Sequence, residues 1–422
     1  MKKKFNYSFV IIALCFLTVC ITLGFCSSGR TMYLTAVTDA LKIKRSAFSL
    51  GDTFRYATST VMNLLFGSFI VRFGEKKLIS AGLISLICFT LINSFAEHLI
   101  FFYISSILLG IGLAFCTTSM MSYVAGKWCS DKNRGKVTGA ILAANGLGGA
   151  ISAQILSPII FEEGNPFGYR NAYRLVAVIL AVLLILIILF FKEKKNSDVG
   201  VPTRKKRKAR GGGWEGIEYS EAKKKSYFYV ALICMTLTGM SLQGLSGIAT
   251  PHMYDVGISK PFVATITTVG SLCLMTSKFL SGLMYDKTGI KITMNVSFLG
   301  AFLSLLALAL ITNTPFGRVL AFLRVIFSAI ALPLETIMLP LLASELFGNK
   351  CFPKMLGFFT AASTLGFAFG APFANLCFDI FGNYNVAFII FACFMLFVSV
   401  AMQFVVRASH RDRKMIMEKE GE

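Results

Sequence analysis

The sequence has almost none of the residues and motifs by which enzymes hold metals or nucleotides. Its 422 residues include only three histidines, none of them grouped, and no His-Glu-x-x-His motif for zinc. No Gly-x4-Gly-Lys-Ser/Thr loop is present to hold the phosphates of ATP. The eleven cysteines have neither metal-ligand spacing nor the pattern of a disulfide framework. These absences exclude ATP hydrolysis and predict a protein without metal or cofactor that is not an enzyme.

Charged residues are also scarce, and basic residues outnumber acidic ones. Only 15% of the residues are charged, with 42 Lys and Arg against 21 Asp and Glu, whereas 55% are hydrophobic and the mean hydropathy is +0.69. A soluble protein could not bury so much apolar surface. The apolar residues instead come in blocks of about 20, the length that a helix needs to span a hydrocarbon core of ~30 Å. The sequence predicts an all-α protein embedded in the lipid bilayer.

We expect twelve transmembrane helices, arranged as two sets of six. The predicted spans are residues 7–31, 46–71, 78–96, 99–125, 136–161 and 172–191, then 227–251, 260–284, 292–311, 317–342, 354–379 and 384–406. This gives an N-terminal six-helix bundle at 1–191, a basic linker at 192–226, a C-terminal bundle at 227–406 and a tail at 407–422. We interpret the linker as a solvated connection, although such basic runs also occur in lipid-binding patches.

The distribution of basic residues indicates orientation. If the N-terminus is inside, most of the 42 Lys and Arg residues fall in the N-terminus, alternate loops, the linker and the tail, all on one side. This is the positive-inside bias of membrane proteins. We therefore expect a multi-pass protein of a cell membrane, of the bacterial inner-membrane type, with both termini in the cytoplasm. The basic balance does not indicate nucleic-acid binding.

The two halves of the chain resemble each other. At an offset of 215 residues, Gly24, Gly29, Gly67 and Gly74 pair with Gly239, Gly244, Gly282 and Gly289. At an offset of 218 residues, six of the thirteen positions from Lys136 to Gly148 are identical to those from Lys354 to Gly366, including Gly139 and Gly357. We expect these small residues to let helices pack closely. Parallel repeats of this kind are typical of transporters that bind substrate between their halves.

A short polar motif follows the second predicted span of each half. It reads Gly282-x3-Asp286-Lys287-x-Gly289-x-Lys291 in the second half and Gly67-x3-Val71-Arg72-x-Gly74-x-Lys76 in the first. The motif resembles the loop signature of the major facilitator superfamily, with Val71 where the first aspartate belongs. The resemblance covers essentially the whole chain. It implies the major facilitator fold and a solute transporter that works by alternating access.

The fifth predicted span has a finer resemblance. Arg134-x4-Gly139-x3-Ala143-x-Asn145-x2-Gly148 is similar to the fifth-helix pattern of the monocarboxylate transporters and the related oxalate/formate antiporters. In those relatives, the positions that match Lys278 and Ser363 are both cationic and receive a dicarboxylate. Since Ser363 removes one of these charges, the resemblance implies a substrate with one carboxylate instead of two.

Polar residues inside the predicted spans are the candidates for a binding site. A cation within a lipid-spanning helix costs roughly 2.5–3.5 kcal/mol on insertion scales, so Lys278 is expected to face a cavity. The alternative is that its ammonium snorkels to the inner interface. The repeat pairs Lys278 with Asn63 and Ser363 with Asn145. The predicted substrate-binding residues are Lys278, Asn63, Asn145, Ser363, Gln243 and Tyr33.

Two further groups of charged residues complete the candidates. Glu335 falls at nearly the depth of Lys278, which predicts an ion pair that either couples transport to protons or is purely structural. Arg55 and Arg324, with Asp52, lie toward the outer side and are predicted to line a vestibule that attracts anions. The alternative for Arg55 is a local salt bridge with Asp52.

The sequence predicts a monomeric transporter of a small organic anion, most simply a monocarboxylate. Without an ATP site, uphill movement would use proton symport or exchange against another solute. Two alternatives stay open. One is a carrier or exporter of a neutral or cationic solute, including a drug, and the other is a membrane sensor that keeps the fold without transporting.

Overall fold

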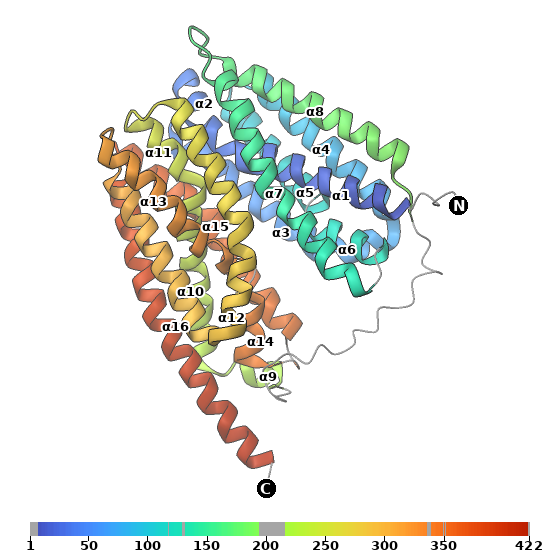
Figure 1. The fold of residues 1–422 in the computed structure, drawn as a ribbon, viewed down its shortest axis with the longest axis vertical. Coiled ribbons are helices and arrows are strands. Elements are labelled where there is room, and N and C mark those ends of the chain that lie inside the picture. The colour runs from blue at the N-terminus through green and yellow to red at the C-terminus, as the bar shows by residue number, and fades with distance from the viewer. Residues whose placement is uncertain are drawn as a thin grey trace. The chain divides into compact units, whose positions relative to one another are not determined.

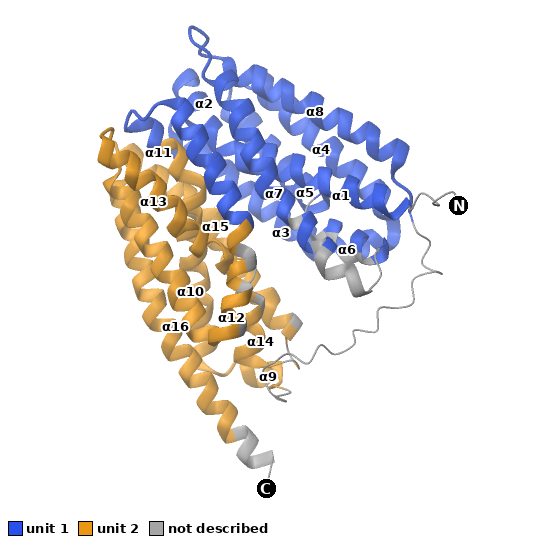
Figure 2. Ribbon diagram, viewed as in Figure 1, with its two compact units in different colours: residues 1–203, 253–275 blue, residues 204–252, 276–422 orange. Residues whose placement is uncertain are grey.

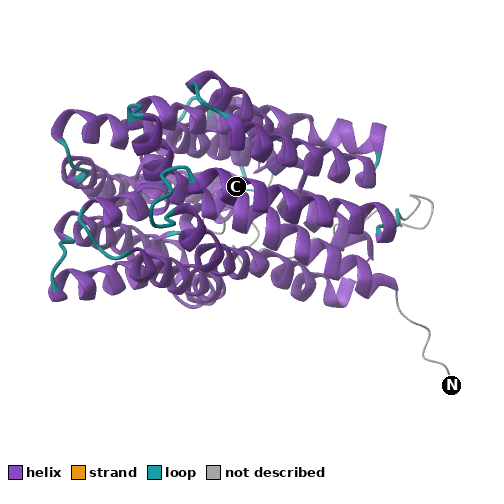
Figure 3. Cartoon of the chain, turned by 90° about the horizontal axis from the view of Figure 1, so that it is seen from above, coloured by secondary structure: helices purple, strands orange, loops and turns teal. Residues whose placement is uncertain are grey.

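The computed structural model describes residues 7–116, 118–128, 131–193, 216–335, 339–348, 350 and 352–420, and this part of the chain contains helices and no strand (Figures 1 and 3). The first helices are α1 (Tyr7–Leu23), α2 (Tyr33–Leu41), α3 (Arg45–Phe73), α4 (Glu75–Phe95), α5 (Leu99–Cys116), α6 (Thr118–Trp128), α7 (Asp131–Ile160) and α8 (Gly168–Phe190). The later ones are α9 (Tyr219–Ala222), α10 (Ser226–Gln243), α11 (Ala249–Asp255), α12 (Lys260–Leu310), α13 (Pro315–Ala331), α14 (Leu339–Phe347), α15 (Phe352–Phe381) and α16 (Asn385–Glu420).

Length and composition identify candidate membrane spans among these helices. Within the described residues, 9 helices are long and apolar enough to cross a bilayer. Their outward faces are apolar too: on α8, Val178, Ile185 and Ile188 are 60%, 56% and 51% exposed. Large exposed apolar surfaces mark contact with a membrane or a partner. The chain is a multi-pass membrane protein, as the sequence predicts.

The chain forms two compact units (Figure 2). Unit 1 comprises Met1–Thr203 and Met253–Met275, and unit 2 comprises Arg204–His252 and Thr276–Glu422. The segment Met253–Met275, which holds the end of α11 and the start of α12, packs with the helices of the first half of the sequence. Most of the predicted linker lies outside the described residues, and the boundaries of the predicted bundles stay a prediction.

Both loop motifs break their helices in the same way. Gly74 separates α3 from α4 with φ 79° and ψ 167°, and Gly289 interrupts α12 with φ 76° and ψ 177°. A positive φ of this size is readily adopted by glycine because it has no Cβ. The break at Gly289 lies between the predicted spans 260–284 and 292–311. The two copies of the predicted repeat therefore share a backbone conformation.

The repeat is also visible where helices cross. In unit 1, a Cβ on Gly148 of α7 would overlap the backbone of Cys20 in α1, and a Cβ on Gly24, which directly follows α1, would overlap the backbone of Gly148. In unit 2, a Cβ on Gly239 or Gly366 would overlap the backbone of the facing helix where α10 and α15 cross. These are the residues that the sequence pairs across the repeat. Helices of the two units therefore cross at equivalent positions of the repeat.

Gly139 and Gly357 do not serve such a crossing. A Cβ on either would meet no heavy atom of a neighbour within 4 Å, and both glycines are exposed. The expectation that they allow close helix packing is wrong. Repetition of a glycine between the halves does not by itself locate a helix crossing, since α7 and α15 meet their partners further along, at Gly148 and Gly366.

Candidate functional site

Unit 1 buries three charged side chains around the start of α3. Arg30, in the turn Gly29–Met32 after α1, is 12% exposed, while Asp52 and Arg55, on α3, are 14% and 7% exposed. The Arg30 guanidinium forms an ion pair with Asp52 Oδ1, and Arg55 Nε lies 3.5 Å from the same oxygen. Two guanidinium groups share one carboxylate. The cluster therefore carries one surplus positive charge.

The second arginine of this cluster is only partly compensated. The Arg55 guanidinium lies 4.2 Å from the centroid of the Tyr56 ring, a cation–π contact. Its Nε is buried and has no hydrogen-bond partner among the described residues. A charge removed from water is costly unless its partners satisfy it. Arg55 thus forms the local salt bridge with Asp52 that the sequence allows, and its Nε–H group is still available as a hydrogen-bond donor.

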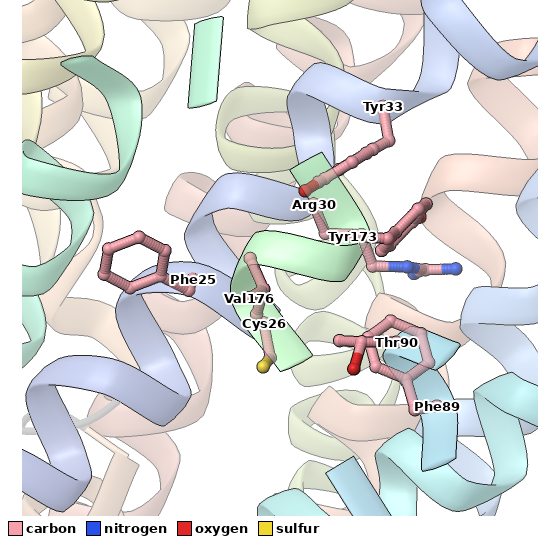
Figure 4. A pocket seen from close by; sticks show the side chains of 8 residues that line it. All are labelled: Phe25, Cys26, Arg30, Tyr33, Phe89, Thr90, Tyr173 and Val176. Atoms are coloured by element: carbon pink, nitrogen blue, oxygen red, sulfur yellow. The ribbon is translucent and has the colours of Figure 1, made fainter. Parts of the chain in front are cut away.

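A narrow pocket lies beside Arg30, between residues of α4, α8, the turns that follow α1 and the start of α2. It is lined by Phe25, Cys26, Arg30, Tyr33, Phe89, Thr90, Tyr173 and Val176 (Figure 4). In Figure 4 the Arg30 guanidinium extends beside the ring of Tyr173. Tyr33 is 1% exposed and stacks on Tyr173 with ring centroids 4.0 Å apart. The side chains that line this pocket pack closely and leave little free space between them.

Unit 2 buries its own arginine on α13. Arg324 is 7% exposed, and its Nη1 donates to the carbonyl of Leu245 at 3.3 Å. Its Nε is buried without a hydrogen-bond partner, and no acidic side chain in the described part of the chain pairs with it. Arg55 and Arg324 are thus buried within their own units, and their role in an outer vestibule stays a prediction.

Two predicted binding residues, Ser363 and Gln243, lie along the contact between α10 and α15. Ser363 is 5% exposed, and its backbone carbonyl faces Gly239. Gln243 is also 5% exposed and packs against Gly247 and Gly370. Both residues therefore belong to the closest helix contact of unit 2, where a change of side chain also changes packing.

The other predicted site residues are more scattered. Asn63 on α3 is exposed, Asn145 on α7 is partly buried, and Glu335 is exposed beyond the end of α13. Lys278 lies in α12, but its side chain falls outside the described part of the structure. The pairing of Lys278 with Glu335 therefore stays a prediction.

The basic residues of the two loop motifs lie at the surface of their units. Arg72 and Lys287 are exposed and Lys291 is partly buried, whereas the surroundings of Gly67, Gly282 and Asp286 fall outside the described part. Next to the first motif, the buried carboxylate of Glu75 pairs with the ammonium of Lys127. Burial lowers the pKa of Lys127, but its hydrogen bonds to Glu75 and Tyr123 outweigh this effect and the pKa is raised. Glu75 supplies an acidic group beside the motif in which Val71 has replaced the aspartate.

A further ion pair, between Arg45 and Asp255, joins distant parts of the chain within unit 1. Arg45, 8% exposed, directs Nη2 to Asp255 Oδ1 at 2.8 Å, and its Nη1 pairs with the other carboxylate oxygen. Nearby along α11, the Tyr254 ring packs edge-on against Phe161 with centroids 4.7 Å apart. Gln154 Nε2 donates to Thr268 Oγ1 at 2.9 Å. These contacts hold the segment Met253–Met275 against α7 and the start of α3.

Sequence reasoning missed Arg30, Arg45 and Asp255. Arg30 carried a signal, because it is a lone cation within the predicted span 7–31. Arg45 and Asp255 fall outside the predicted spans, and 210 positions separate them, so no local pattern connects them.

Known proteins match this chain along most of its length. The model of the Major Facilitator Superfamily matches residues 14–242 and 231–421. The chain is 24% identical over 360 residues to Multidrug resistance protein 2 of Bacillus subtilis (strain 168), covering 82% of each protein. Among solved structures, the nucleoside transporter NupG gives a TM-score of 0.73 at 15% identity, covering 95% of this chain and 99% of that one.

A bacterial homolog of the human lysosomal transporter Spinster, in an inward-facing and occupied conformation, gives a TM-score of 0.72 at 13% identity. The match covers 96% of this chain and 98% of that one. At these identities the solved structures share the fold alone. The expected fold class, twelve transmembrane helices in two six-helix bundles, is confirmed by the family match and by this likeness.

Proposed function

Because the chain belongs to the Major Facilitator Superfamily, whose members are membrane transporters, we propose that it moves a small organic anion with one carboxylate across the membrane. Transport proceeds by alternating access, with the two halves of the chain rocking about the substrate. The sequence has no ATP-binding loop, so the energy comes from a proton gradient or from exchange against another solute.

The observation that carries this proposal is a surplus of buried positive charge in each unit. Unit 1 holds two arginines around Asp52, and unit 2 holds Arg324 without an acidic partner among the described residues. Arg55 and Arg324 each retain a buried Nε that has no hydrogen-bond partner among the described residues. Guanidinium groups match the geometry of a carboxylate, so in this proposal these donors attract the anion before its carboxylate reaches Lys278.

The resemblance of the fifth predicted span to the monocarboxylate and oxalate/formate branch supports the same substrate class. Lys278 supplies one cation where that branch has one, and the neutral Ser363 stands where it has a second. In this proposal Lys278 receives the carboxylate, Asn63 and Asn145 contribute polar contacts, and Glu335 competes with substrate for Lys278.

The similarity to Multidrug resistance protein 2 favours a second candidate, a drug exporter. Such a carrier would accept lipophilic cations or neutral compounds and would not need surplus positive charge. The two candidates differ in the sign of charge that they move, so one panel of substrates separates them.

The test is uptake into proteoliposomes of the purified protein. Radiolabelled lactate, oxalate, uridine and a lipophilic cation would be compared with and without a pH gradient. We expect lactate counterflow that oxalate competes with weakly. Lys278→Gln and Arg324→Gln should each reduce it, whereas Arg318→Gln, an exposed arginine on the same helix as Arg324, should not. Transport of the cation with no lactate counterflow would replace this proposal by the drug exporter.

We further propose that both termini lie in the cytoplasm of a cell with an inner membrane of the bacterial type. The bias of basic residues supports this orientation. Single cysteines at Glu163 and Asn313, both exposed in loops, should react with an impermeant thiol reagent added outside intact cells. Reaction of either site only after the membrane is opened would reverse the orientation.

A further inference from the structure

Helix α16 is longer than a bilayer is thick, and its composition changes partway along. It has 36 residues, none of them charged from Asn385 to Val406, and Arg407 is the first charged one. At a rise of ~1.5 Å per residue, the stretch from Asn385 to Phe404 is about 30 Å long, which is the thickness of the hydrocarbon core. Arg407 then lies in the headgroup layer of one leaflet, roughly 4.5 Å beyond Phe404. Figure 1 shows that α16 continues past α14 and α9.

One face of α16 is exposed on both sides of this boundary. Phe397, Val400 and Phe404 are 56%, 59% and 63% exposed. Arg407 and Arg411 are exposed as well, and they follow at the same helical spacing. With 3.6 residues per turn, these five side chains fall within a stripe about 80° wide. The apolar surface that faces lipid tails therefore continues directly into a basic surface, and we call these five residues the outer stripe of α16.

The opposite face of the same turns is attached to unit 2. Ser409 Oγ donates to the carbonyl of Leu346, near the end of α14, at 2.7 Å. Asp412 is the only acidic residue of the sequence 407–415, and its Oδ2 lies 2.7 Å from Lys225 Nζ. These contacts hold the last turns of α16 in a fixed orientation. They also direct the acidic group away from the outer stripe.

The two arginines of the outer stripe have no acidic partner among the described residues. Side chains of a helix lean toward its N-terminus, so Arg407 and Arg411 lean back toward the bilayer surface. Arginine also lays its apolar stem along apolar surface while its charged end stays at the interface. Both guanidinium groups can therefore reach the layer that holds lipid phosphates.

We propose that Arg407 and Arg411 bind the headgroup phosphates of anionic phospholipids in the leaflet from which this end of α16 emerges. A guanidinium can donate two parallel hydrogen bonds to one phosphate, which a lysine cannot do. Lys414, also exposed, adds positive charge one turn beyond Arg411. The inference goes beyond the proposed function and does not depend on which solute is carried.

Anionic lipid is favoured over zwitterionic lipid because the outer stripe carries charge that nothing in the described part of unit 2 neutralises. Near an anionic surface, each Lys or Arg strengthens attachment about fivefold. A lipid bound between the two arginines would also restrict the last turns of α16, since their other face is already held by α14 and Lys225.

The experiment is hydrogen exchange of the full chain in an uncharged detergent, with phosphatidylglycerol as the probe. We expect added phosphatidylglycerol to slow amide exchange over residues 405–415, whereas phosphatidylcholine and inorganic phosphate do not. Arg407→Gln with Arg411→Gln should raise the amount of phosphatidylglycerol needed for half of the effect about 25-fold. Arg174→Gln with Arg318→Gln removes the same charge from exposed positions near the starts of α8 and α13, and should leave it unchanged.

Native mass spectrometry gives a second measurement, in which wild type should retain more phosphatidylglycerol than the Arg407→Gln and Arg411→Gln double variant. Equal slowing by phosphatidylcholine would show contact with lipid tails alone, and equal slowing by inorganic phosphate would show a site for free anions. Either result, or a double variant that responds to phosphatidylglycerol as wild type does, would overturn the inference. None of these measurements uses lactate, so a failure of the proposed function would be seen separately.

Discussion

At the residue scale, Asp52 holds two positive charges in place. Arg30 pairs with it directly, and Arg55 Nε approaches the same oxygen at 3.5 Å. All three side chains are largely buried, so little water can replace the carboxylate. The cluster is therefore stable only while Asp52 is ionised.

We expect Asp52→Asn to destabilise the protein by about 3–5 kcal/mol, the usual cost of breaking a buried ion pair from one side. The amide would leave two guanidinium charges without a counter-charge. Thermal unfolding in detergent, followed by size-exclusion fluorescence, measures the loss. Asp39→Asn is the matched control, because Asp39 is 71% exposed and lies 3.8 Å from Arg45.

Removing both charges of the Arg30–Asp52 pair should restore part of the stability. Arg30→Gln with Asp52→Asn leaves one charged side chain in this cluster, Arg55, which still contacts the Tyr56 ring. A double variant as unstable as Asp52→Asn would show that the ion pair is not what stabilises this region.

At the element scale, two helix crossings depend on glycine. In unit 1, α1 meets α7 at Gly148, and in unit 2, α10 meets α15 at Gly366. Both contacts are so close that there is no space for a methyl group on the glycine. In a membrane there is no hydrophobic force between helices, so such close packing has to stabilise the bundle. A methyl group at the crossing must push the helices apart.

Gly148→Ala should therefore destabilise unit 1 by about 1–3 kcal/mol, the usual cost of overpacking a core. Gly139→Ala, on the same helix, places its methyl in open space and should be neutral or stabilise by up to ~1 kcal/mol through helix propensity. The same contrast is expected for Gly366→Ala and Gly357→Ala in unit 2. Thermal unfolding of the four variants checks it. Equal effects within each pair would contradict the crossing geometry.

The sequence predicted much of the fold because its signals are local. Apolar runs of spanning length, the repeat and the two loop motifs located the helices and the breaks at Gly74 and Gly289. The salt bridge of Asp52 with Arg55 was predictable in the same way, since three positions separate them on one helix.

The rest of the site depends on contacts between distant segments. Arg30 reaches Asp52 from the turn after α1, and Arg45 reaches Asp255 from 210 positions away. His252 contacts the carbonyl of Leu308 on α12, which lies 56 positions away in the sequence. The sequence pattern of a single helix does not indicate which residues of other helices will lie next to it. Polar residues within spans were therefore found, but their partners were not.

At the scale of the whole molecule, the packing of the segment Met253–Met275 bears on how the two halves of the chain move during transport. By sequence it belongs to the second half, yet it packs in unit 1 against α7, where Gly149 faces Ser271. In alternating access the two halves must separate on one side of the membrane and then on the other. We infer that this contact opens once in each cycle, and that the Arg45–Asp255 ion pair breaks with it.

A disulfide across this contact should therefore stop transport. The distance from a Cβ on Gly149 to that of Ser271 is 3.3 Å, close to the 3.5–4.5 Å that a disulfide needs. We expect Gly149→Cys with Ser271→Cys to lose lactate counterflow on oxidation and to regain it when a reductant is added. The two single variants and the wild type, with its eleven native cysteines, should not respond to the oxidant. A double variant that forms the disulfide and still transports would show that α7 and Met253–Met275 stay together throughout the cycle, and the opening movement would then have to lie elsewhere.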